Sequence, residues 1–331
     1  MRSLRRGPAA PRPQLAYRGR VGVPVAVVPA LIVVAVVGYL VGHSGTKGGS
    51  SGERRETAKA VNVLIEYPTG WRRVSGASPI PGLALTQQQL LAPGGAANVA
   101  GLVVGSLSSS ESGPLPASFL EHVRRQPQTT IVDLVELQAY RYAGLSVRGF
   151  DGALTAFVVP NPAGRSTMLA CYARSAGATY MRACEQTVAS VTIAGQPQNI
   201  ALTPDPAYAG AISAAITTLD RLRVRLTREL HPQTSATSAE RLARRLAAGY
   251  AAAHATLAQL EPSSAAQRAQ TALSDALARA QAGYTALAAA AAGRSAPAYA
   301  AAQSRIAAAE TAVDRGLENL VLLGYSGAAG A

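Results

Sequence analysis

The chain has few of the residues on which most catalytic and metal-binding sites depend. Its 331 residues include two cysteines and four histidines, and no two histidines have the H-x-x-x-H spacing. Enzymes need a nucleophile beside a base, paired carboxylates or a metal cluster. No phosphate-binding glycine loop and no nucleophile-elbow motif is present. We therefore expect no catalysis, no metal and no cofactor; the remaining alternative is a hydrolase whose Ser, Asp and His come together only on folding.

Charged residues are also scarce, at 15% of the chain, and Lys47 and Lys59 are the only lysines. The net charge of +13 nevertheless suggests nucleic acid or an anionic membrane as a partner. Residues 1–20 carry six arginines and no acid, whereas residues 61–200 and 201–331 carry only +2 and +3. The two long segments are thus close to neutral, which argues against nucleic-acid binding.

Residues 21–41 form a run of 21 positions without any charge. As a helix the run is about 30 Å long, which matches the hydrocarbon core of a bilayer. We expect a transmembrane helix over 21–42 that follows a basic tail over 1–20. The positive-inside rule places this tail in the cytoplasm and the rest of the chain outside. A cleaved signal peptide is the competing interpretation.

Small residues in this apolar run raise the question of self-association. Gly38 and Gly42 have the G-x-x-x-G spacing that lets two membrane helices approach closely. A homodimer through this motif is one expectation; the alternative is that small residues are common throughout the chain. Residues 43–59 are polar and rich in Gly and Ser, which predicts a flexible linker.

Residues 60–195 alternate apolar, β-branched runs with turn residues, which predicts mainly strands. The predicted helices are Pro116–Gln126 and Arg182–Ser190. We expect an α+β domain with an antiparallel sheet covered on one side. The predicted strands are 60–67, Leu83–Leu91, Val99–Leu107, Thr130–Leu137, Tyr140–Val147, Leu154–Pro160 and Ser166–Arg174.

Cys171 and Cys184 both lie in this domain, thirteen positions apart. In an oxidising compartment outside the cell, a lone pair is most simply a disulfide. A reactive or metal-binding pair is the alternative, although two thiols without a nearby histidine leave a zinc site half empty.

Short motifs in this domain resemble known proteins. The segment IEYPTGW, Ile65 to Trp71, is similar to the opening of PsbP-like domains. The later AYRYAGL, the VVPNPAG turn and the cysteine-containing strand with its helix resemble LpqN-like extracytoplasmic proteins of actinobacteria. The resemblance covers about residues 60–195. It implies a non-catalytic, membrane-attached accessory or binding domain, and it assigns no functional residue.

A second hypothesis is that the α+β domain binds a small ligand or a lipid in a pocket. Ligand pockets are lined mainly by apolar and aromatic side chains with a few polar groups. The candidate pocket aromatics are Trp71, Tyr140, Tyr142 and Phe157. The competing interpretation of Trp71 is core packing that fixes the first turn.

After a Pro-containing linker over 196–206, the chain becomes rich in alanine. Alanine is the best helix former, and the breaks at His231-Pro232, Glu261-Pro262 and 293–297 are stop signals. Apolar residues recur in steps of three and four, which predicts an antiparallel all-α bundle over 207–325. The predicted helices are 207–230, 236–260, 263–292 and 296–323.

Four arginines, at 221, 223, 225 and 228, stand close together in the first of these helices. Interrupting acids favour a solvated face, and contact with an anionic envelope polymer or lipid headgroups is the alternative. We thus expect a single-pass protein of the bacterial envelope in which an α+β domain and a helical bundle lie outside the cell. Its expected role is to bind or scaffold, with the lipid bilayer and another envelope protein as partners.

Overall fold

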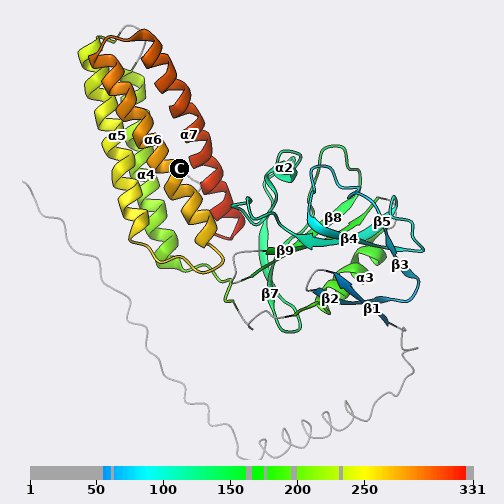
Figure 1. Ribbon diagram of the computed structural model, residues 1–331. Helices are drawn as coiled ribbons and strands as arrows, with labels where there is room; N and C mark the ends of the chain where they lie inside the picture. The colour runs from blue at the N-terminus through cyan, green and yellow to red at the C-terminus, as the bar shows by residue number, and fades with distance from the viewer. Residues whose placement is uncertain are drawn as a thin grey trace, which may run out of the picture. The chain divides into compact units, whose positions relative to one another are not determined.

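The computed structural model describes residues 55–60, 63–161, 166–174, 177–194, 200–230 and 234–325. The predicted basic tail, transmembrane helix and most of the linker, together with Gly38 and Gly42, lie outside the described residues. Within the described ranges, no helix has the length and apolar character needed to cross a bilayer. The expected order of an antiparallel sheet region followed by helices is confirmed (Figure 1).

The sheet region is built around seven strands in the order β3-β4-β5-β9-β8-β7-β6, and the neighbouring strands pair antiparallel. Strands β8 and β9 lie near the centre and are almost completely buried. A smaller sheet has the order β1-β2-β10. The strands of the large sheet are β3 (Trp71–Val74), β4 (Thr86–Pro93), β5 (Ala100–Ser106), β6 (Thr129–Asp133), β7 (Gln138–Tyr142), β8 (Ala153–Pro160) and β9 (Ser166–Ala173).

Both faces of the large sheet are covered, which corrects the expectation of one covered side. On one face α3 (Ala178–Ala189) and the small sheet pack against residues such as Leu102 and Leu169. On the other face, Tyr140 and Met168 belong to a core that continues into the helical bundle. The near-continuous apolar sequences of β8 and β9 agree with this burial, because a strand with one exposed face alternates polar and apolar residues.

Several local predictions need correction, and one of them is the strand Thr130–Leu137, which ends at Asp133. β1 (Arg55–Ala60) pairs with β2 (Val63–Pro68), so a strand stands where part of the linker was expected. The remaining strand of the small sheet is β10 (Thr192–Ile193). The predicted helix over Pro116–Gln126 forms only as α2 (Ala117–Leu120), because the chain then turns and Val123 bridges to Val147. The predicted strand Tyr140–Val147 ends at Tyr142, two residues before Gly144 with its φ of +63°.

The C-terminal part consists of four long helices, as the alanine-rich sequence predicted. Their ends agree with the expected ends within a few residues. Side-chain caps by Asp205, Ser235 and Ser295 mark the starts of three of them. The helices are α4 (Pro206–Glu229), α5 (Ala236–Ala258), α6 (Gln267–Ala292) and α7 (Ala296–Leu322).

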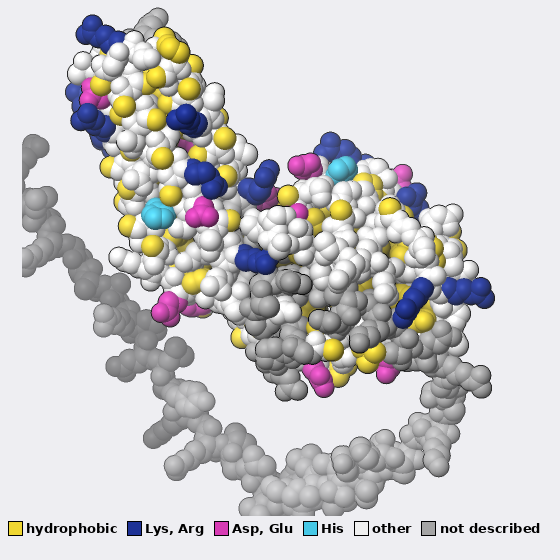
Figure 2. All heavy atoms as spheres, viewed as in Figure 1, with side chains coloured by type: hydrophobic (Ala, Val, Ile, Leu, Met, Phe, Trp, Pro, Cys, Tyr) yellow, Lys and Arg dark blue, Asp and Glu magenta, His cyan; other side chains and the backbone are white. Residues whose placement is uncertain are grey.

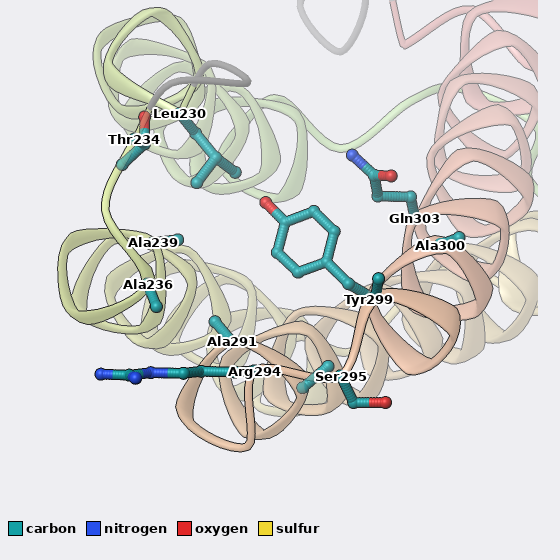
Figure 3. Close-up of a pocket in the computed structure, with 12 residues that line it drawn as sticks. Leu230, Thr234, Ala236, Ala239, Ala291, Arg294, Ser295, Tyr299, Ala300 and Gln303 are labelled. Carbon is teal, nitrogen blue, oxygen red and sulfur yellow. The ribbon is translucent and has the colours of Figure 1, made fainter.

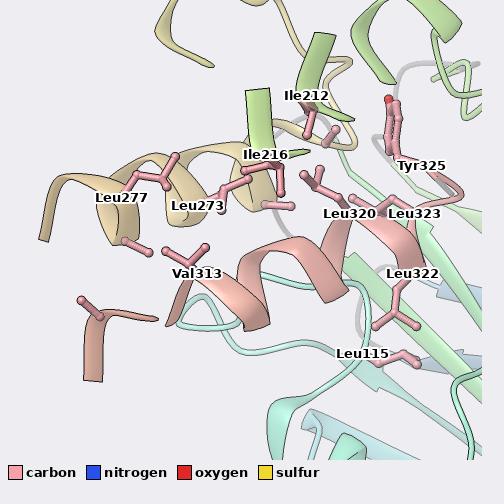
Figure 4. Packing of buried hydrophobic residues seen from close by; sticks show 14 of the residues in the cluster. Leu115, Ile212, Ile216, Leu273, Leu277, Val313, Leu320, Leu322, Leu323 and Tyr325 are labelled. Atoms are coloured by element: carbon pink, nitrogen blue, oxygen red, sulfur yellow. The ribbon is translucent and has the colours of Figure 1, made fainter. Parts of the chain in front are cut away.

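The core of the bundle follows the apolar stripes. Leu273 and Leu277 of α6 lie close to Val313 of α7, and Leu320 lies on the side of Ile212 and Ile216 (Figure 4). Gly283 and Gly316 let α6 and α7 approach closely, since a Cβ on Gly316 would lie 3.0 Å from the Cβ of Leu273. Small residues at such positions allow the helices to pack at short range.

The last turn of α7 contacts the sheet region. Leu322 faces Leu115 (Figure 4), and its carbonyl accepts hydrogen bonds from Tyr142 Oη at 2.7 Å and Thr129 Oγ1 at 2.9 Å. Asn319 donates to Ser112 Oγ at 3.1 Å. The carbonyls at a helix C-terminus have no partner within the helix, so the sheet supplies the donors that the end of α7 needs.

Candidate functional site

The two cysteines form the predicted disulfide. Cys171 of β9 and Cys184 of α3 are both buried, and their Cα atoms are 5.9 Å apart. The bridge fixes α3 onto the central strands. Within the described residues no group of three or more His, Cys, Asp and Glu side chains is placed to hold a metal.

The structure does not bring the four candidate pocket aromatics together. Trp71 and Phe157 lie in the core between the sheet and α3, where Trp71 stacks on Tyr180 at 5.4 Å between ring centroids. Tyr140 and Tyr142 project from the opposite face of the sheet into the other core. All four rings are buried. Burial raises the pKa of Tyr140 and Tyr142 well above the usual tyrosine value.

A polar layer crosses the middle of the bundle, with one residue from each helix. We define it as Arg223 of α4, Tyr250 of α5, Tyr284 of α6 and Glu310 of α7. Arg223 stands four residues after Leu219 and three before Leu226, both buried, so it occupies a position of the apolar stripe. The rings of Tyr250 and Tyr284 stack with 5.4 Å between their centroids.

One carboxylate oxygen holds this layer together. Glu310 Oε1 accepts hydrogen bonds from Tyr250 Oη at 2.7 Å and Tyr284 Oη at 2.9 Å. The guanidinium of Arg223 lies 3.4 Å from the same oxygen and also pairs with Asp220 at 3.1 Å. Burial and the hydrogen bonds to Glu310 raise the pKa of both tyrosines, so they stay neutral donors at any physiological pH. We expect such a network to set the register of the four helices.

The positive charges of the bundle are concentrated at one end. We call this the distal end: the last turns of α4 and α6 and the first turns of α5 and α7, residues 219–230, 236–246, 282–294 and 296–306. It contains nine arginines and three acids, whereas the rest of residues 201–331 contains three arginines and six acids. Figure 2 shows dark-blue side chains gathered on the upper part of the bundle.

The same end contains an open pocket of about 550 Å³, within the range typical of small-molecule sites. The side chains that α6 contributes to its walls are short, because this helix ends in five consecutive alanines. The lining residues come from both pairs of helices and their connections: Leu230, Thr234, Ala236, Ala239, Ala290, Ala291, Arg294, Ser295, Ala296, Tyr299, Ala300 and Gln303. We call it the distal pocket.

Tyr299 is the largest side chain in the distal pocket. Its ring is half-buried, and its hydroxyl is directed toward Leu230 (Figure 3). Among the described residues this hydroxyl has no hydrogen-bond partner. Arg294 extends past Ala291 toward Ala236 along the rim (Figure 3). Its φ of +51° lies in the left-handed region, where non-glycine residues are uncommon.

A second hollow, of about 740 Å³, lies on the sheet region. Arg141 pairs there with both carboxylate oxygens of Glu185, at 3.0 and 3.1 Å, and Arg174 lies over the ring of Phe150 at 5.2 Å. Arg124 and Asp151 complete its charged lining. Arg141 is paired with Glu185, so Arg124 and Arg174 against Asp151 leave the hollow with a small positive excess.

Sequence reasoning missed both the polar layer and the distal end. In sequence the arginines at 221–228 predict one helix face, and the net charge of 201–331 as a whole is only +3. An antiparallel fold brings the end of one helix beside the start of the next, so the arginines of four helices gather. The predicted helix ends contain this signal, because they show which arginines share one end of the bundle.

No protein-family model matches the chain, and no curated protein is similar to it. The chain is similar to the solution structure of cyanobacterial PsbP (CyanoP) from Synechocystis sp. PCC 6803, with 13% sequence identity and a TM-score of 0.27. The similarity covers 45% of this chain and 98% of that one. It concerns a PsbP-like fold at most, and we base no functional argument on it.

Proposed function

We propose that the chain is a single-pass membrane protein of a bacterial envelope, with its N-terminus in the cytoplasm, that binds or scaffolds other envelope components without catalysing a reaction. The uncharged run over 21–41, preceded by six arginines, supports the anchor. A disulfide between Cys171 and Cys184 supports an oxidising location for the sheet region.

One observation carries the binding role: the distal end combines an open pocket with eight arginines besides Arg223, whose guanidinium is paired with Glu310 and Asp220. Arginines at a helix C-terminus favour the helix dipole, but those near the start of α5 do not. The first turns of α5 and α7 also lack acids. The arginines near the start of α5 therefore gain nothing from the helix dipole, whereas the positive charge of the distal end attracts anionic partners over about 8 Å at physiological salt.

Site-specific photocrosslinking in intact cells tests this role. A photoreactive phenylalanine replaces Tyr299 in the distal pocket or, as the control, Glu261, which is exposed at the opposite end of the bundle. We expect a discrete adduct from position 299 only, and a weaker one after Arg244→Glu and Arg245→Glu. Equal labelling from both positions would show that the distal end is not the binding end.

The membrane anchor is tested separately. Carbonate extraction should leave the full chain in the membrane fraction, and external protease should cleave the bundle in spheroplasts. A chain that is released by carbonate, or protected from protease, would contradict the proposed topology.

Ligand binding by the sheet region is the second candidate function. The hollow lined by Arg124, Arg141 and Arg174 supports it, in place of the buried aromatics that the sequence suggested. A ligand there would be small and polar. A thermal-shift screen of the full chain against small anions, repeated with Arg174→Ala, tests this candidate; no shift with any anion would contradict it.

A further inference from the structure

We propose that the distal pocket binds a phosphate-bearing amphiphile, with the alkyl chain in the pocket and the phosphate on Arg294 at its rim. This inference rests on the proposed function, because it names the ligand class for the end that we expect to bind. Three features of the pocket carry it.

The first feature is the apolar interior. Seven of the twelve described residues that line it are leucine or alanine. The side chains of the described residues leave an open space of about 550 Å³ between these walls. An alkyl chain gains free energy by leaving water for such a surface.

The second feature is the position of the charges. Arg294 itself lines the pocket, and its backbone conformation holds it at the turn between α6 and α7. Arg228, Arg241 and Arg305 lie exposed within the distal end. Guanidinium groups bind phosphate through paired N–H donors, and arginine suits this role better than lysine. Every basic residue of the distal end is an arginine.

The third feature is a set of polar groups beside the apolar walls. The hydroxyl of Tyr299 has no partner among the described residues, and the side chain of Gln303 lies nearby in the pocket (Figure 3). An amphiphile needs a few such groups where its chain meets its head, because they fix its orientation. A purely apolar ligand would leave these groups and the arginines unused.

The experiment uses the full chain in phosphatidylcholine nanodiscs and isothermal titration calorimetry. Octyl phosphate is the probe, inorganic phosphate supplies the head alone, and octyl glucoside supplies the tail with a neutral head. We expect octyl phosphate to bind at least about tenfold more tightly than either control, because only it uses both parts of the site. Equal affinity for inorganic phosphate, or for octyl glucoside, would overturn the proposal.

Matched variants locate the binding. Ala300 lines the pocket and Ala301 does not, and both are exposed, so Ala300→Trp should fill the pocket while Ala301→Trp serves as its control. Arg294→Glu should weaken octyl phosphate binding by about tenfold, whereas Arg315→Glu, outside the distal end, should not. Binding that Ala300→Trp and Arg294→Glu leave unchanged would place the ligand elsewhere and overturn the proposal.

The two proposals fail separately. If octyl phosphate does not bind but position 299 still gives its specific photoadduct, the ligand class is wrong and the binding role of the distal end stands. If the adduct is an envelope protein formed without any amphiphile, the same conclusion follows. If neither binding nor adduct is found, both proposals are wrong.

Discussion

Tyr142 Oη of β7 donates a 2.7 Å hydrogen bond to the carbonyl of Leu322, at the C-terminal end of α7 and 180 residues away in sequence. Both residues are completely buried. A second donor, Thr129 Oγ1, reaches the same carbonyl at 2.9 Å. The last carbonyls of a helix otherwise depend on water, so this shared acceptor makes the end of the bundle dependent on the sheet.

The shared acceptor predicts a non-additive pair of substitutions. Tyr142→Phe and Thr129→Val should each lower the free energy of unfolding by about 1 kcal/mol, because one donor remains. The double variant leaves a buried carbonyl without any donor, so we expect a loss of about 3 to 4 kcal/mol, more than the sum. Urea denaturation of the full chain in detergent measures these differences.

Thr130→Val is the control for this cycle. Thr130 is the next residue in β6, and its hydroxyl bonds to the exposed carbonyl of Arg141 within the same sheet. Its replacement should change the stability by less than about 0.5 kcal/mol. Strict additivity of Tyr142→Phe and Thr129→Val would show that the carbonyl finds another donor.

The polar layer predicts a large effect from a single carboxylate. Glu310→Leu removes the acceptor of Tyr250 and Tyr284 and the partner of Arg223, whose side chain is 25% exposed. We expect the free energy of unfolding to fall by about 2 to 4 kcal/mol. The fall is smaller than for a completely buried ion pair because Arg223 is partly exposed. Glu318→Leu, at an exposed position of the same helix, should cost less than about 0.5 kcal/mol.

A fully apolar layer tests whether the network provides specificity rather than stability. Arg223→Leu, Tyr250→Phe, Tyr284→Phe and Glu310→Leu together remove every member. Replacing a buried polar network by packed apolar residues is often neutral or stabilising. We expect the combined variant to recover most of the stability lost in Glu310→Leu, as measured by thermal unfolding. Additive losses would instead show that the layer stabilises the bundle.

The sequence predicted the bundle well because its signals are local. Alanine content, the caps at Ser235 and Ser295, and steps of three and four at Leu242, Leu246 and Tyr250 all indicate the same helices. The sheet strands were predicted with similar success where the β-branched runs are long. The helix expected at Pro116–Gln126 was wrong because its apolar spacing serves packing in a turn, with Phe119 completely buried.

The candidate site could not be predicted in the same way because it depends on non-local neighbours. Nothing near Glu310 in sequence indicates Tyr250, sixty residues earlier. The distal end likewise exists only when four helix ends meet. The four aromatics chosen for a pocket show the converse error: Phe157 pairs with Arg141 across β7 and β8, so its ring leaves the sheet on the face opposite to Tyr140 and Tyr142.

The disulfide predicts a defined loss of stability. Cys171 and Cys184 close a loop of thirteen residues, and both sulfurs are inaccessible. Replacing both by alanine should lower the free energy of unfolding by about 3 kcal/mol, mainly because the unfolded chain gains freedom. Alkylation followed by mass spectrometry should find no free thiol in the native chain, and thiols only after reduction in denaturant. Free thiols in the native chain would contradict the bridge.

Buried tyrosines predict unfolding at high pH. Burial raises the pKa of Tyr172 to about 12 and the pKa of Tyr140, Tyr208, Tyr250 and Tyr284 further, whereas tyrosine in the unfolded chain has a pKa near 10.0. Below pH 10 both states keep these protons, so the groups cause no pH dependence. Above pH 10 the unfolded state loses them first, and the free energy of unfolding falls with each further unit of pH.

The size of the fall follows from the number of tyrosines that ionise only on unfolding. Each contributes about 1.4 kcal/mol per pH unit until the pH reaches its folded pKa. Urea midpoints at pH 9, 10 and 11, with tyrosinate absorbance at 295 nm, should show little change over the first interval and a steep fall over the second. Tyr250→Phe removes one of these tyrosines, so it should reduce the slope of the fall by one group. A stability that stays constant to pH 11 would mean that these hydroxyls reach water in the folded chain.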